Sequence, residues 1–105
     1  MDQFHLTDEA IFDIDAIFLY LLHKANEEIA DRVVTELFKA FYRLAEIPNI
    51  GHRRADLTSK DVFFYKVFSY LIIYSPRSKP LRILGVLHGK RNVARILRRR
   101  SRGIQ

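Results

Sequence analysis

Histidine and cationic side chains gather at three places in the second half of the chain, where they could act on a phosphate group. The three groups are His52, Arg53 and Arg54; Arg77, Lys79 and Arg82; and His88, Lys90 and Arg91. RNA cleavage without a metal needs a group that deprotonates the 2′-hydroxyl, a group that protonates the leaving oxygen, and cations that stabilise the developing charge. His88 with Arg53 or Arg91 could supply these functions. His88 could instead be a structural residue at a strand end, hydrogen-bonded to a neighbouring loop.

Other chemistries find no support in the sequence. The chain has no glycine-rich phosphate loop, no His-Glu-x-x-His pair and no Gly-x-Ser-x-Gly turn, which nucleotide hydrolases, zinc proteases and serine hydrolases use. It has no cysteine, so neither a disulfide nor a thiolate metal site is available. The carboxylates fall on two expected helices at spacings such as that of Glu9 and Asp13, which is typical of a solvated face. We therefore expect no metal, no cofactor and no catalytic carboxylate pair.

Charge is distributed unevenly along the 105 residues, whose net charge is +6. Residues 1–48 contain four Lys or Arg and ten Asp or Glu, whereas residues 49–105 contain fourteen Lys or Arg and only two acids, Asp56 and Asp61. The first half therefore carries −6 and the second half +12. A basic half of this size predicts an anionic partner, either a nucleic acid or an acidic protein segment. The alternative is a basic surface that is merely solvated.

Two helices must lie in the acidic half. A short strand at residues 3–6 precedes Thr7, a suitable N-cap for a helix with Asp8 and Glu9 in its first turn. Its apolar residues recur at three- and four-residue steps, while Asp13 lies off this stripe. The stripe consists of Ile11, Ile14, Ile17, Phe18, Leu21 and Leu22. Asn26 caps a second periodic helix that ends before residue 48, and the short connection predicts an antiparallel hairpin.

Three strands follow in the basic half, at residues 62–67, 70–74 and 81–87, rich in β-branched and aromatic side chains. Their short connections predict antiparallel pairing, and apolar residues on both faces of residues 70–74 predict that both faces are covered. The expected fold is α+β with the order β-α-α-β-β-β, a two-helix hairpin packed on a small antiparallel sheet. We expect one domain over residues 1–97, ending in a short amphipathic helical turn.

Residues 98–105 are expected to form a basic C-terminal tail. It could contact phosphates or an acidic partner, or it could be disordered. The N-terminal residues lack the features of a secretory signal, and the longest apolar run of the first half, residues 16–22, is too short to span a bilayer. The sequence therefore predicts a soluble, cytoplasmic protein that makes no membrane contact.

Three motifs carry a resemblance that covers nearly the whole chain. They are Pro48-x-x-Gly51 after the second helix, Tyr70-x-Ile72-x-Tyr74 in the middle strand, and Val86-x-His88-Gly89-x-Arg91 at the end of the last strand. In this order and spacing they resemble the RelE/ParE superfamily of type II toxin-antitoxin toxins, and its ParE branch in particular. That superfamily includes gyrase poisons, which act by binding, and ribosome-dependent mRNA endonucleases.

The resemblance implies a toxin that binds and poisons DNA gyrase. It also implies a cognate antitoxin whose acidic-leaning C-terminal segment folds around the toxin. One alternative is a RelE-like mRNA endonuclease acting in the ribosome, and another is a basic adaptor that binds nucleic acid through its tail. In the family's Arg-Val-x-His pattern the residue before Val86 is commonly arginine, but here it is Gly85, which favours the gyrase poison. The residues expected to bind the target or the antitoxin are Arg53, Arg54, Arg77, Arg82, His88, Arg91, Arg95, Arg98 and Arg99.

Overall fold

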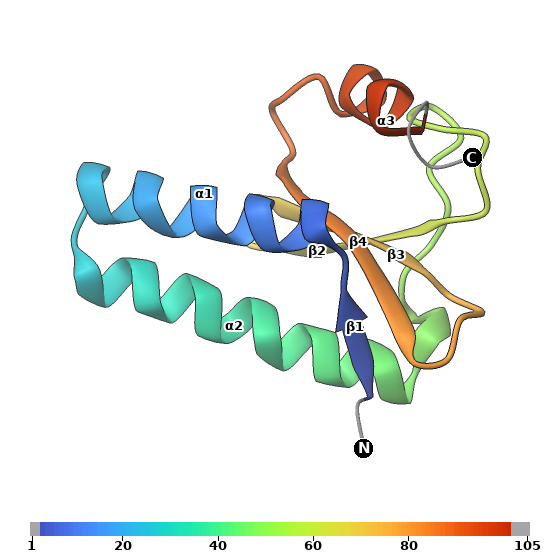
Figure 1. Ribbon diagram of the computed structural model, residues 1–105, viewed down its shortest axis with the longest axis horizontal. Helices are drawn as coiled ribbons and strands as arrows, with labels where there is room; N and C mark the ends of the chain where they lie inside the picture. Colours follow the sequence, from blue (N-terminus) through green and yellow to red (C-terminus); the bar gives the residue numbers. More distant parts are fainter. Residues whose placement is uncertain (1–2, 102–105) are drawn as a thin grey trace.

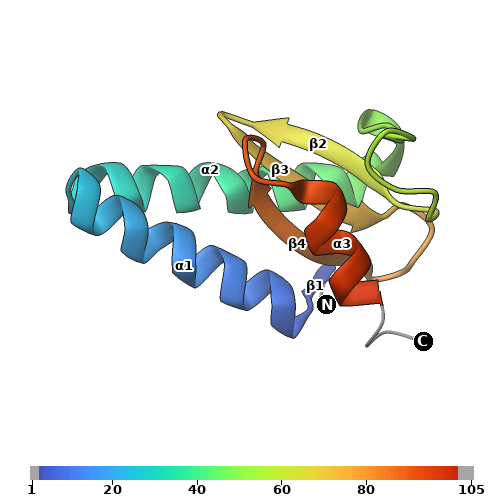
Figure 2. The same cartoon turned by 90° about the horizontal axis from the view of Figure 1, so that it is seen from above.

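The computed structural model describes residues 3–101 of the chain. In chain order the elements are β1 (Phe4–Leu6), α1 (Asp8–Lys24), α2 (Glu27–Glu46), the 3-10 turn η1 (Pro48–Ile50), β2 (Phe63–Val67), β3 (Tyr70–Ser75), β4 (Leu81–His88) and α3 (Val93–Ser101). Figures 1 and 2 show α1 and α2 side by side against one face of a four-stranded sheet, with α3 against the other face. The predicted α+β fold is confirmed.

Both long helices begin where the sequence predicts. Thr7 and Asn26 each accept a hydrogen bond from the N–H three residues on, at 3.2 and 2.8 Å, and so satisfy a donor that the first helical turn leaves free. Only Ala25 and Asn26 separate the two helices, which therefore run antiparallel. α2 ends at Glu46 because Pro48 cannot continue it and disfavours helical geometry in the residue before it.

The sheet has the strand order β1-β4-β3-β2. β2, β3 and β4 pair antiparallel, as predicted. β1 pairs parallel with β4, Phe4 opposite Leu81 and Leu6 opposite Ile83, so the complete sheet is mixed. Parallel pairing is possible because two helices and two strands connect β1 to β4, far more than the dozen residues that a parallel crossover needs.

A bulge interrupts the pairing of β3 with β4. Residues 73–74 of β3 lie opposite Gly85 and Ile83, so Leu84 is an additional residue in β4. As a result Ile83 and Val86, three residues apart, both face α1 and α2, whereas Leu84 faces α3. The bulge thus shifts the alternation of side chains along β4 by one residue.

Both faces of β3 are buried, as predicted. Tyr70, Ile72 and Tyr74 pack with Phe41 and the rest of the α1–α2 hairpin. Leu71 and its neighbour on the same face, at residue 73, pack under α3. The sheet therefore separates two apolar cores, and α3 is an integral part of the second one.

The far end of the helical hairpin extends past the end of the sheet (Figure 1). Leu19 and Tyr20 there are 62% and 58% exposed. Ile11 and Leu22, which belong to the apolar stripe identified in the sequence, are 45% and 40% exposed, so the stripe is not buried as a whole. The apolar stripe of α1 is wider than the surface that α2 and the sheet provide. In the described part of the chain, no helix is both long enough and apolar enough to cross a membrane.

The C-terminal helix is longer than the sequence suggests. Helical structure begins at Val93, as predicted, but continues through residues 98–101, where a basic tail was expected to begin. The remaining residues of that expected tail, 102–105, lie outside the described residues.

Candidate functional site

Two of the sequence motifs are joined through one buried hydroxyl group. Tyr74 donates from Oη to the Pro48 carbonyl at 2.6 Å and accepts a hydrogen bond from the Gly51 N–H at 3.0 Å. A Cβ atom on Gly51 would lie 2.5 Å from this hydroxyl, so the close approach requires glycine. Burial raises the pKa of Tyr74, an effect that the hydrogen bond with Gly51 partly offsets. The Pro-x-x-Gly turn is therefore built around the end of the middle strand.

The other tyrosine of that strand meets the third motif. The rings of Tyr70 and His88 pack edge to face, with centroids 5.3 Å apart. Nδ1 of His88 accepts a hydrogen bond from the Lys90 N–H at 3.1 Å, so Nε2 carries the hydrogen in the neutral ring. This contact matches the structural interpretation of His88. It also argues against a general base, because a neutral ring so bonded has no free lone pair to accept a proton.

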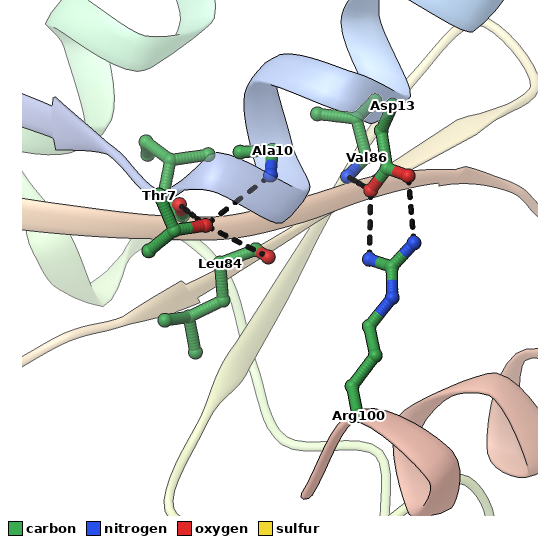
Figure 3. Close-up of polar contacts among 7 residues, drawn as sticks. Thr7, Ala10, Asp13, Leu84, Val86 and Arg100 are labelled. Carbon is green, nitrogen blue, oxygen red and sulfur yellow. Dashed lines mark hydrogen bonds and ion pairs between the residues drawn. The ribbon is translucent and has the colours of Figure 1, made fainter. Parts of the chain in front are cut away.

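Asp13 joins α1, β4 and α3 (Figure 3). Its Oδ2 accepts a hydrogen bond from the Val86 N–H at 2.9 Å, and the Arg100 guanidinium donates to both carboxylate oxygens at 2.8 and 2.7 Å. Asp13 is only 4% exposed, so the expectation that it lies on a solvated face is wrong. Its partners lie 73 and 87 residues along the chain, beyond the reach of any local pattern. Hydrogen bonding to Asp13 raises the pKa of Arg100.

Gly85 makes room for this ion pair. A Cβ atom at Gly85 would lie 2.9 Å from Nη1 of Arg100 and 3.1 Å from Oδ2 of Asp13. In the family pattern an arginine commonly stands at the position of Gly85. In this chain the guanidinium of Arg100, from α3, lies beside that position instead. That arginine is bonded to Asp13, so it holds α3 against the sheet.

Three arginines expected to bind a partner are paired within the chain. Arg54 makes two hydrogen bonds to Asp56, at 2.9 and 2.8 Å, and Arg77 makes two to Asp61 at the same distances. Arg53 also donates to Asp61. The hydrogen bond from Arg54 lowers the pKa of Asp56. These exposed pairs are weak, so they reduce the positive charge here without burying it.

Arg82 lies apart from the other expected binding residues. Six residues of extended strand, roughly 20 Å, separate it from His88. Its neighbours are His5, Asp8 and Glu9, around a separate hollow of about 270 Å³. The structure therefore does not bring Arg82 together with the cations at the other end of β4.

The remaining cations converge where β4 ends. His88, Lys90 and Arg91 lie between two concave surfaces and line both. The first has a volume of about 350 Å³ and is also lined by Arg54 and Lys66; we call it the cationic pocket. The second, about 750 Å³, lies between α1 and the β2–β3 hairpin, and we call it the α1 groove. Arg53 lines neither, so of the residues considered for a nuclease the structure brings together His88 and Arg91 but not Arg53.

The α1 groove is largely apolar. Ile17 and Leu21 of α1 line it together with Val86 of β4. Two aromatic residues at its border, Tyr20 and Phe68, are 58% and 51% exposed. Phe68 lies in the two-residue turn between β2 and β3 and has a φ of 54°, a left-handed conformation that such turns require but that bulky residues rarely adopt.

The arginines of α3 divide into two sets. Arg95, Arg98 and Arg99 are exposed, and their three- and four-residue spacings place them on one side of the helix. Arg91, exposed just before the helix, extends this row towards the cationic pocket. Arg100 alone of this helix's cations turns inward to Asp13.

Several site residues were not predicted from the sequence. Tyr20 resembled any residue of an apolar helix, and Lys66 resembled a solvated lysine on an edge strand. Gly85 did carry a signal, because an isolated glycine inside a strand is typical of a bulge or of a close approach by another group. Within residues 3–101, no three His, Cys, Asp or Glu side chains lie together in a way that could hold a metal ion.

Comparisons with known proteins bear on this arrangement. The family model described as the ParE toxin of the type II toxin-antitoxin system parDE matches residues 4–93. Among solved structures, the chromosomal ParDE TA system from P. aeruginosa superimposes with a TM-score of 0.69 at 20% identity, covering 81% of this chain and 92% of that chain. At this identity the likeness is one of fold. No curated protein matches the sequence.

Proposed function

Because this chain belongs to the ParE toxin family of type II toxin-antitoxin systems, we propose that it is a toxin neutralised by a cognate antitoxin and that it acts by binding and poisoning DNA gyrase. The observation that carries the proposal is the α1 groove, an open apolar surface bordered by positive charge. Such a surface suits a partner segment that combines apolar and acidic residues.

The antitoxin would occupy the α1 groove. Apolar side chains of its C-terminal segment would pack on Ile17 and Leu21, between the exposed rings of Tyr20 and Phe68. Its acidic residues would face the cations at the end of β4, near Lys90. Leu19, beside Tyr20 near the far end of the helical hairpin, is also exposed, so a segment longer than the groove could find a further apolar contact there.

The groove can be tested with a double variant, Tyr20→Ala with Phe68→Gly. Glycine suits the positive φ at position 68, so a loss of binding would not reflect a strained hairpin. The partner in this test is the cognate antitoxin, which we expect to be encoded by a short reading frame that overlaps or abuts this gene. We expect its affinity to fall by at least about 30-fold, because exposed aromatic anchors dominate such interfaces.

The matched control is Phe12→Ala, since Phe12 is 69% exposed on α1 but does not line the groove. This variant should bind the antitoxin normally. Equal losses in the two variants would contradict the groove assignment. Co-expression of the partner should restore growth to cells that express the unaltered chain.

Inhibition of gyrase by binding is supported by the state of His88. Its Nδ1 is occupied by Lys90, and Arg53 lies outside the pocket. The deciding assay compares purified gyrase with supercoiled DNA against translating ribosomes with mRNA. We expect trapped gyrase cleavage complexes, and we expect His88→Gln to retain this activity. Site-specific mRNA cuts without any effect on gyrase would instead establish the endonuclease.

A further inference from the structure

We propose that the cationic pocket and the arginine row of α3 form a binding site for the phosphate backbone of double-stranded DNA. This site is separate from the apolar floor of the α1 groove. The proposed contact is made directly with DNA and requires neither the antitoxin nor gyrase. The proposal therefore goes beyond the function inferred above.

The pocket concentrates like charges around one hollow. Arg54, Lys66, Lys90 and Arg91 line it, and no acidic side chain does. Asp56 bonds Arg54 from outside the lining and offsets part of its charge. Clustered charges of one sign in a concave surface strengthen the local field and repel one another, so an anionic ligand relieves the repulsion.

α3 extends the positive surface away from the pocket. Its first residue, Val93, lines the pocket, so the positive end of the helix dipole opens there. Arg95 and Arg99 lie about 6 Å apart along the helix axis, four residues at 1.5 Å each. Phosphates of one DNA strand advance by about 3.4 Å per step along the duplex and also wind around it. Arginines at this spacing can therefore reach separate phosphates through their long side chains.

The ion pair of Asp13 with Arg100 makes this surface rigid. It attaches the last turn of α3 to α1 and β4, at distances of 2.7 and 2.8 Å (Figure 3). The exposed arginines are therefore carried on a fixed helix, which loses less conformational entropy on binding than a free basic tail would.

The scarcity of aromatic side chains on this surface favours a duplex. No Phe, Tyr or Trp lines the cationic pocket or occurs in the described part of α3, and the one ring in the lining, His88, packs against Tyr70. Proteins that bind unpaired bases stack them on several exposed aromatic rings, which this surface does not offer. The major groove of DNA admits an α-helix, whereas that of duplex RNA is too narrow. Double-stranded DNA is therefore the ligand we assign.

The test compares two triple variants of the full chain that remove the same charge from opposite sides. The first is Lys90→Ala, Arg91→Ala and Arg95→Ala. The control is Arg32→Ala, Lys39→Ala and Arg43→Ala, all exposed on α2. Binding to a short fluorescent DNA duplex is measured by anisotropy at increasing salt. The first variant should bind at least about 10-fold more weakly, and its plot of log affinity against log salt should be flatter by about three units.

Each other outcome would overturn the proposal. Equal weakening in both triple variants would mean general attraction to a basic protein, with no located site. Tighter binding to single-stranded or duplex RNA than to DNA would refute the choice of ligand. If the first variant unfolds, Arg91→Ala alone should flatten the salt plot by about one unit, and an unchanged slope would refute the site. The titration contains neither antitoxin nor gyrase, so its failure leaves the proposed function standing.

Discussion

The hydroxyl group of Tyr74 holds the turn after α2 in place through its bonds to Pro48 and Gly51. Tyr74→Phe keeps the ring but leaves a buried N–H and a carbonyl without this partner. We expect the free energy of unfolding to fall by about 1–3 kcal/mol, as measured by urea denaturation. Tyr42→Phe serves as the control, because Tyr42 is 53% exposed and should lose almost nothing. Similar small losses in both variants would show that the turn does not depend on this hydroxyl.

Burial of tyrosine side chains also makes the free energy of unfolding depend on pH in the alkaline range. Burial raises the pKa of both Tyr70 and Tyr74 above the ordinary value of 10.0. Above pH 10 the unfolded chain therefore binds fewer protons than the folded chain, and stability falls as pH rises. The tyrosine contribution is complete below pH 10 and is lost as pH rises through the raised folded-state pKa values.

Urea midpoints measured from neutral to strongly alkaline pH would reveal this dependence. The fall above pH 10 should be shallower in a variant with Tyr70→Phe and Tyr74→Phe than in the unaltered chain. The comparison removes the contribution of lysines that titrate in the same range, because both proteins contain them. Parallel curves would contradict the assignment of the alkaline loss to these two residues.

At the scale of elements, the attachment of α3 depends on the ion pair of Asp13 with Arg100. Their side chains are 3% and 19% exposed, so Arg100→Ala leaves an almost fully buried carboxylate with only the Val86 N–H. We expect a loss of about 2–3 kcal/mol in chemical denaturation, below the full range for a buried pair because solvent reaches the arginine. Arg99→Ala, one residue away and exposed, should change stability by less than about 0.5 kcal/mol.

A double-mutant cycle would separate the ion pair from other effects. Asp13→Ala with Arg100→Ala should lose less than the sum of the two single variants, because each single change leaves a charge without its partner. If the two losses simply add, α3 is held by its apolar contacts alone. In that case the sheet residues beneath α3 should exchange their amide hydrogens at the same rate in Arg100→Ala as in the unaltered chain.

The elements with local signals could be predicted from the sequence, and those that depend on distant contacts could not. Thr7 and Asn26 are recognisable as caps because a cap bonds within its own helix. The parallel pairing of β1 with β4 and the burial of Asp13 depend on residues more than 70 positions away. The cations of the candidate site could be recognised in the sequence by residue type. The sequence did not show that Arg53 and Arg77 share Asp61, because this contact depends on how the loops fold.

At the scale of the whole molecule, stability rests on a core shared by the helical hairpin and the sheet. Phe41 of α2 and Ile72 of β3 are both fully buried in this core. Phe41→Ala or Ile72→Ala should lower the free energy of unfolding by roughly 3 kcal/mol. Lys39→Ala, whose side chain is 70% exposed, should cost little. Thermal and urea denaturation would measure both, and equal effects would contradict the assignment of the core.

The strand order also determines when the protein can finish folding. β4 lies inside the sheet between β1 and β3, yet it is the last of the described strands in chain order. Arg100 likewise follows its partner Asp13 by 87 residues. Since a chain emerges from the ribosome N-terminus first, neither the complete sheet nor this ion pair can form until residues 81–100 have been synthesised. The two proposed binding surfaces, to which β4 and the segment after it contribute, are therefore assembled late, and a partner made beforehand could bind them as soon as they form.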